Sequence, residues 1–71
     1  MKIEYLVLTP SKLRVNIDKR EFIMGGEGTL EPKFYADAGS FPDDLSDAQK
    51  KEIISFIEKK SSKEKVPVVF E

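Results

Sequence analysis

The chain has 71 residues, the length of one small domain, and we expect a single domain over residues 1–71. It contains neither cysteine nor histidine, which excludes disulfides, the usual zinc and copper sites, thiol catalysis and imidazole acid–base catalysis. Twelve basic and thirteen acidic residues give a net charge of -1, so electrostatics gives no reason to expect nucleic acid or an anionic membrane as a partner. We predict no catalytic residue, metal or cofactor.

The sequence carries no signal for export or membrane insertion. The longest apolar run, residues 5–8, is too short to span a bilayer, and no apolar stretch of signal-peptide length follows Met1. We therefore expect a cytoplasmic protein, and the absence of cysteine agrees with that location.

The first strand is predicted at residues 2–8, where β-branched and aromatic side chains alternate with polar ones. Tyr5 and its alternate neighbours share one face, while Leu6 and Leu8 fall on the other. Apolar side chains on both faces indicate that the end of this strand is covered on both sides, as in a central strand.

Two further strands are predicted to follow in an antiparallel meander. Residues 12–18 alternate polar and apolar side chains without a break, and residues 21–24 form the next strand after a short polar connection. The second strand directs three apolar side chains inward: Leu13, Val15 and Ile17.

A glycine cluster follows the third strand. Gly25, Gly26 and Gly28 lack the lysine and the following helix of a phosphate-binding loop, so they predict a turn or bulge between strands. Residues 29–32 then link to a fourth strand at residues 33–36.

The helix is predicted to begin after Ser46, because Gln49 stands at the capping-box spacing and Asp47 lies in the first turn. Lys59 and Lys60 are expected to close it at the end that favours cations. The apolar stripe comprises Leu45, Ile53, Ile54, Phe56 and Ile57.

A solvated run at residues 61–65 is expected to lead into a last strand at residues 66–70. Pro67 has no amide hydrogen, so it indicates the start of a strand or an edge position. The order of elements, β-β-β-β-α-β, predicts an α+β fold with a meander of about four strands, one amphipathic helix packed on the sheet and a C-terminal strand. The direction of that last strand is left open.

Charge is segregated along the chain. Residues 21–49 contain seven acids and one base, whereas the segments on either side are basic. The spacing does not fit a calcium loop, and a domain of this size leaves little room for a catalytic carboxylate pair in a cleft. A solvated loop and a surface that complements a basic partner both stay open.

The aromatic residue in this polar loop, Phe41, has two interpretations. It either packs over the sheet or serves as an exposed anchor for a partner. If the segment is a binding surface, the partner-binding residues are Asp37, Phe41, Asp43, Asp44 and Asp47.

Four segments together resemble the small immunity proteins of bacterial polymorphic toxin systems: residues 1–5, 34–37, 51–54 and 68–71. That family tends to carry a Trp-Glu-Pro-Pro-like segment before the helix, where this chain has residues 40–44 and no tryptophan. The resemblance implies a non-enzymatic cytoplasmic protein that binds and neutralises a toxin. Many such toxins are nucleases with basic clefts, which an acidic loop complements.

Two alternatives belong to other classes. The first is a structural or regulatory module that self-associates through a sheet edge, as a homodimer through the C-terminal strand at residues 66–70. The second is an enzyme that uses paired carboxylates, although most catalytic side-chain types are missing.

Overall fold

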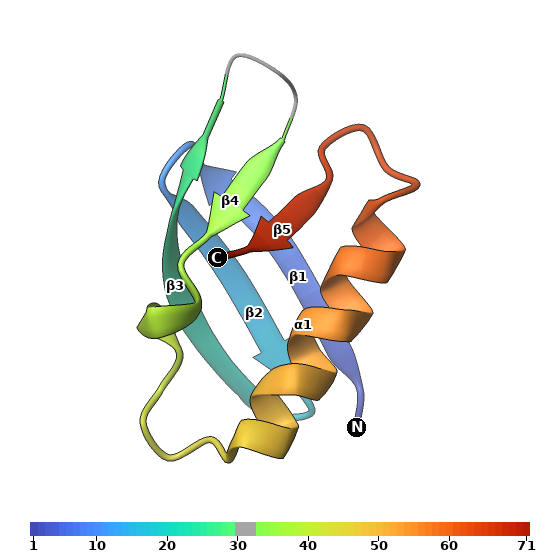
Figure 1. Ribbon diagram of the computed structural model, residues 1–71. Coiled ribbons are helices and arrows are strands. Elements are labelled where there is room, and N and C mark those ends of the chain that lie inside the picture. The colour runs from blue at the N-terminus through green and yellow to red at the C-terminus, as the bar shows by residue number, and fades with distance from the viewer. Residues whose placement is uncertain (30–32) are drawn as a thin grey trace.

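The computed structural model describes residues 1–29 and 33–71 and contains a five-stranded sheet and one α-helix (Figure 1). This confirms the predicted α+β fold and its β-β-β-β-α-β order. The elements are β1 (Ile3–Thr9), β2 (Lys12–Ile17), β3 (Arg20–Gly28), β4 (Phe34–Ala36), the 3-10 helix η1 (Ala38–Ser40), α1 (Asp47–Ser61) and β5 (Val68–Phe70).

The strands lie in the order β1-β2-β3-β4-β5, and each pairs antiparallel with the next except β5, which runs parallel to β4. This settles the direction of the last strand. Pro67 precedes β5, and its carbonyl accepts a hydrogen bond from the Phe34 amide at 2.9 Å. The predicted link at residues 29–32 lies almost wholly outside the described residues.

β2 matches its sequence pattern, because Leu13, Val15 and Ile17 are all buried. Its connection to β3 is tight, and Asp18 adopts a left-handed backbone conformation there with φ of 55°. Aspartate is among the few residues with a side chain that enter this region at low cost.

β1 is an edge strand, and the prediction that both of its faces are covered is wrong. Leu6 is 49% exposed and Leu8 43% exposed, because these side chains point away from the face on which α1 packs. Ile3, on the inner face, is buried.

The glycine cluster lies inside β3, so the predicted turn or bulge between strands is wrong. β3 pairs with β2 as far as Gly25 and with β4 from Gly26 onward, so the glycines mark the point where the strand changes partner. A β-carbon on Gly26 would lie 2.7 Å from the Tyr35 carbonyl oxygen and would overlap the Phe34 ring. Only glycine allows this close approach.

α1 covers one face of the sheet and contacts both β5 and β1 (Figure 1). The predicted capping box is present, since the Ser46 hydroxyl accepts from the Gln49 amide and the Gln49 side chain accepts from the Ser46 amide. Of the predicted stripe, Leu45, Ile53 and Ile57 are buried, whereas Phe56 is 39% exposed and faces away from the core.

Gly26→Ala is expected to destabilise the protein by about 1 to 3 kcal/mol, because the added methyl group enters an occupied space beside Phe34. Gly25→Ala is the matched control, since a β-carbon there meets no atom within 4 Å. Urea denaturation of the two variants measures the difference. Equal unfolding midpoints would show that the Phe34 ring does not constrain Gly26.

Candidate functional site

The predicted binding residues do not form one cluster. The Asp37 amide donates to the Gly25 carbonyl at 2.9 Å, whereas Asp44 is held by Arg20. Gly25 and Arg20 are five residues apart on β3, a distance of about 16 Å along an extended strand. The acidic segment is therefore anchored at two separate places on the sheet.

Asp37 has a structural role in addition to its charge. Its carboxylate accepts a hydrogen bond from the Gly39 amide at 2.9 Å and caps η1. Ser40 continues the same turn, because its hydroxyl donates to the Asp37 carbonyl at 2.6 Å and accepts from the Gly25 amide at 3.1 Å. The Asp37 carboxylate remains exposed but is fixed in orientation.

Asp44 is balanced by a base. Two guanidinium nitrogens of Arg20 each donate to one Asp44 oxygen at 2.7 Å, which is the fork geometry of a bidentate pair. These hydrogen bonds hold the pKa of Asp44 below its usual value and raise the pKa of Arg20. The pair fastens the loop before α1 to the start of β3, so Asp44 adds little net field for a partner.

Asp43 and Asp47 lie near the start of α1 with exposed side chains. Asp47 is the first residue of the helix, where the helix dipole favours an anion. Neither side chain forms an ion pair with a described residue.

Phe41 is buried, which confirms the first of its two interpretations, packing over the sheet, whereas its use as an exposed anchor for a partner is wrong. It is 5% exposed and packs between two other rings. Its ring stacks on Phe70 with centroids 5.8 Å apart and meets Phe22 edge-on at 6.2 Å. The apolar surface of three rings outweighs the polar character of the loop, and Phe41 attaches that loop to the core.

Asp37 lies beside two acids that the sequence analysis did not single out. We call this surface the acidic hollow; it is lined by Gly25, Gly26, Glu27, Tyr35, Ala36, Asp37 and Glu71. None of its three carboxylates forms an ion pair with a described residue. In the sequence, Glu27 lies between two glycines that predict a turn, and Glu71 lies outside the acidic segment. Only the pairing of β3, β4 and β5 brings these side chains together.

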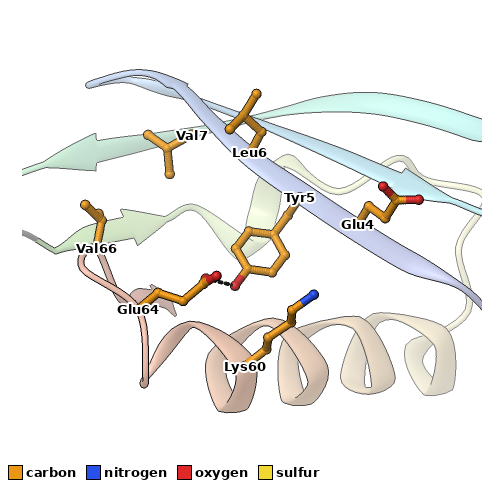
Figure 2. A pocket seen from close by; sticks show the side chains of 7 residues that line it. All are labelled: Glu4, Tyr5, Leu6, Val7, Lys60, Glu64 and Val66. Carbon is orange, nitrogen blue, oxygen red and sulfur yellow. Dashed lines mark hydrogen bonds between the residues drawn. The ribbon is translucent and has the colours of Figure 1, made fainter.

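A second surface, the β1 groove, lies between β1 and the end of α1 (Figure 2). It has a volume of about 430 Å³ and is lined by Glu4, Tyr5, Leu6, Val7, Lys60, Glu64 and Val66. Figure 2 shows the Tyr5 ring pointing from β1 toward the end of α1, and its hydroxyl donates to the carboxylate of Glu64, which follows the helix. Burial and this hydrogen bond raise the pKa of Tyr5 above its usual value, so the hydroxyl stays protonated at neutral pH and keeps the proton that it donates to Glu64.

The free edge of β5 is occupied by side chains of α1. The Val68 amide donates to the Ser61 hydroxyl oxygen at 2.8 Å, and the Ser61 hydroxyl lies 3.2 Å from the Val68 carbonyl oxygen that it donates to. The Phe70 amide donates to the Glu58 carboxylate at 2.8 Å. The amides that a homodimer through the C-terminal strand requires are therefore already bonded.

The prediction of a solvated run at residues 61–65 is wrong for Ser61, which is fully buried at 0% exposure. The available signal was its position, four residues after Ile57 and eight after Ile53, on the buried stripe of the helix. The serine hydroxyl at this position forms hydrogen bonds with the edge of β5, which an apolar side chain cannot form.

No protein-family model, curated protein or solved structure matches this chain. Within residues 1–29 and 33–71, no group of three or more acidic residues is arranged to hold a metal ion. No helix in that part of the chain is long and apolar enough to cross a membrane.

Ser61→Ala is expected to destabilise the protein by about 1 to 3 kcal/mol, because it leaves the buried Val68 amide without an acceptor. Ser55→Ala, on an exposed position of the same helix, is the control and is expected to change stability by no more than about 0.5 kcal/mol. Thermal and urea unfolding measure both. Similar effects of the two substitutions would contradict the role given to Ser61.

The Arg20–Asp44 pair predicts a pH-dependent contribution to stability. Because the folded state lowers the pKa of Asp44, the contribution is present above the ordinary aspartate value of about 3.9 and is lost as pH falls through the lower folded value. The melting temperature of the native chain should therefore fall toward that of Asp44→Asn below about pH 4. A constant difference between the two curves across this range would rule out the linkage.

Proposed function

We propose that this chain is a non-enzymatic, cytoplasmic binding protein of the immunity type, which neutralises a toxin by placing carboxylates against a basic cleft. The observation that carries the proposal is the acidic hollow, where Glu27, Asp37 and Glu71 lie around one depression without basic partners among the described residues. Asp43 and Asp47 add two further exposed carboxylates near the start of α1.

The way in which the fold holds these carboxylates favours the binding of a basic partner. Glu27 lies on β3, Glu71 directly follows β5, and the Asp37 carboxylate is held by the Gly39 amide. Acids attached to paired strands lose little backbone freedom when a partner binds. Uncompensated acids of one sign also accelerate the encounter with a basic surface, most strongly at low ionic strength.

The proposal differs from the sequence-based prediction in four residues, two of them removed and two added. Asp44 is neutralised by Arg20, and Phe41 belongs to the core, so neither is assigned to the binding surface. Asp37, Asp43 and Asp47 are retained, and Glu27 and Glu71 are added to them.

The first test is biological. The chain is co-expressed with the product of the neighbouring gene, as the candidate toxin, in cells whose growth that product arrests. The proposal expects growth to be restored and the two proteins to co-purify. Continued arrest, with the chain present in soluble and folded form, would contradict it.

Charge variants test the surface. Glu27→Gln with Asp37→Asn removes two charges, and asparagine retains the oxygen that caps η1. This double variant is expected to slow association with the toxin about tenfold at low salt, with a smaller effect at high salt. The matched control, Asp18→Asn with Glu52→Gln, removes the same charge from other exposed positions. Equal association rates for the two double variants would exclude the acidic hollow as the binding surface.

A further inference from the structure

The two edge strands of the sheet differ in whether their outer backbone groups are hydrogen-bonded. The edge of β5 is bonded to Ser61 and Glu58 of α1, whereas no described strand pairs with the outer edge of β1. Open edges are places where another strand adds by backbone hydrogen bonds. β1 is therefore the candidate interaction edge of this fold.

The hydrogen bonds of β1 fix which backbone groups are available. The Lys2 carbonyl accepts from the Asp18 amide at 2.8 Å, and the Lys2 amide donates to the Asp18 side chain at 2.9 Å, so residue 2 faces β2. In an antiparallel pair the direction alternates from residue to residue. The amide and carbonyl groups of Tyr5 and Val7 therefore point outward, away from β2.

Exposed apolar side chains lie on the outer face of the sheet, on β1 and β3. Leu6 lies opposite Arg14, which lies opposite Ile23, so Leu6 and Ile23 share the outer face with one arginine between them. Leu6 is 49% exposed and Ile23 47% exposed. Leu8 extends this apolar surface along β1. A patch that reaches the end of a sheet suits a partner that continues the sheet.

The middle of β1 lacks the devices that protect natural edges. Residues 5–7 contain no charged side chain and no proline, and the register shift follows them, between Val7 and Thr9. Charges and prolines at an edge normally prevent pairing with another strand. The stretch that could accept a strand is thus the central part of β1, bounded by Glu4 on one side and Thr9 on the other.

We infer that β1 pairs antiparallel with β1 of a second copy of this chain, about a two-fold axis near Leu6. In this register Tyr5 lies opposite Val7 of the other copy, so the outward backbone groups of these residues bond to each other. Tyrosine opposite valine is a favourable cross-strand pair. Leu6 of the two copies meet, which joins the two exposed apolar patches into one.

The charges select this arrangement over the parallel one. Antiparallel pairing sets Glu4 of one copy opposite Leu8 of the other, next to Lys12, which starts β2 beside Thr9. Parallel pairing would instead set Glu4 against Glu4. Among the described residues, Glu4 forms an ion pair only with Lys2, at 3.7 Å between two exposed side chains. A net charge of -1 adds almost no repulsion between copies.

Sedimentation velocity over about 5 µM to about 1 mM measures the self-association directly. The inference expects a monomer that converts to a dimer within this range, with no larger species, because a two-fold contact is closed. A chain that remains monomeric throughout, or one that assembles beyond a dimer, would overturn the inference.

Leu6→Lys places two lysines near the axis and is expected to raise the dimer dissociation constant at least about fivefold. Its matched control is Ser55→Lys, which adds the same charge at an exposed position of α1 outside the β1 groove and should leave the constant unchanged. Circular dichroism melts confirm that each variant is folded. Equal effects of the two substitutions, or a Leu6→Lys dimer as tight as the native one, would refute the contact.

A charge exchange tests the register without altering the apolar surface. Glu4→Lys and Lys12→Glu are each expected to weaken the dimer about fivefold, because the two-fold axis makes the contact between Glu4 and Lys12 occur twice. The double variant exchanges the two charges and should recover most of the loss. Additive losses in the double variant would rule out the antiparallel register. These measurements use the chain alone, so their outcome is independent of whether it binds a toxin.

Discussion

The rest of the structure depends on the hydrogen bonds that the side chains of Ser61 and Glu58 form with the edge of β5. These side chains supply acceptors for the Val68 and Phe70 amides, which a further strand would otherwise have to provide. Ser61 lies on the same buried side of α1 as Ile53 and Ile57, which pack in the core. A strand of three residues is short, and bonding on both of its edges compensates for that length.

The closure of one edge determines which surfaces stay available. β5 is bonded to β4 on one side and to α1 on the other, so a partner that approaches here meets side chains rather than free backbone groups. These side chains are Glu71, Glu27 and Asp37, which line the acidic hollow. β1, at the opposite end of the sheet, keeps its outward amides and exposed leucines. The two surfaces are chemically distinct, one charged and one apolar, and thus suit different partners.

The sequence predicts elements whose signals are local. The alternation of β2 and the capping box of α1 are each complete within a few residues, and both are observed. The signals that mislead depend on distant contacts. The glycines of β3 resemble a turn, but Gly26 is required because the Phe34 ring lies against the strand. Phe41 appears in a polar loop, and only the folded chain places Phe70 against it.

The same limit applies to the candidate site. The sequence indicates an acidic segment, yet it does not show that Arg20 neutralises Asp44 or that Glu71 joins Asp37, because both relations cross the sheet. The difference between the edges is likewise a property of tertiary contacts. Amide hydrogen exchange followed by NMR in dilute solution tests this central claim most directly. The account predicts that Val68 and Phe70 exchange slowly while Tyr5 and Val7 exchange fast, and that only Tyr5 and Val7 slow down as the protein is concentrated. Exchange at Val68 and Phe70 as fast as at Tyr5 and Val7 would contradict it.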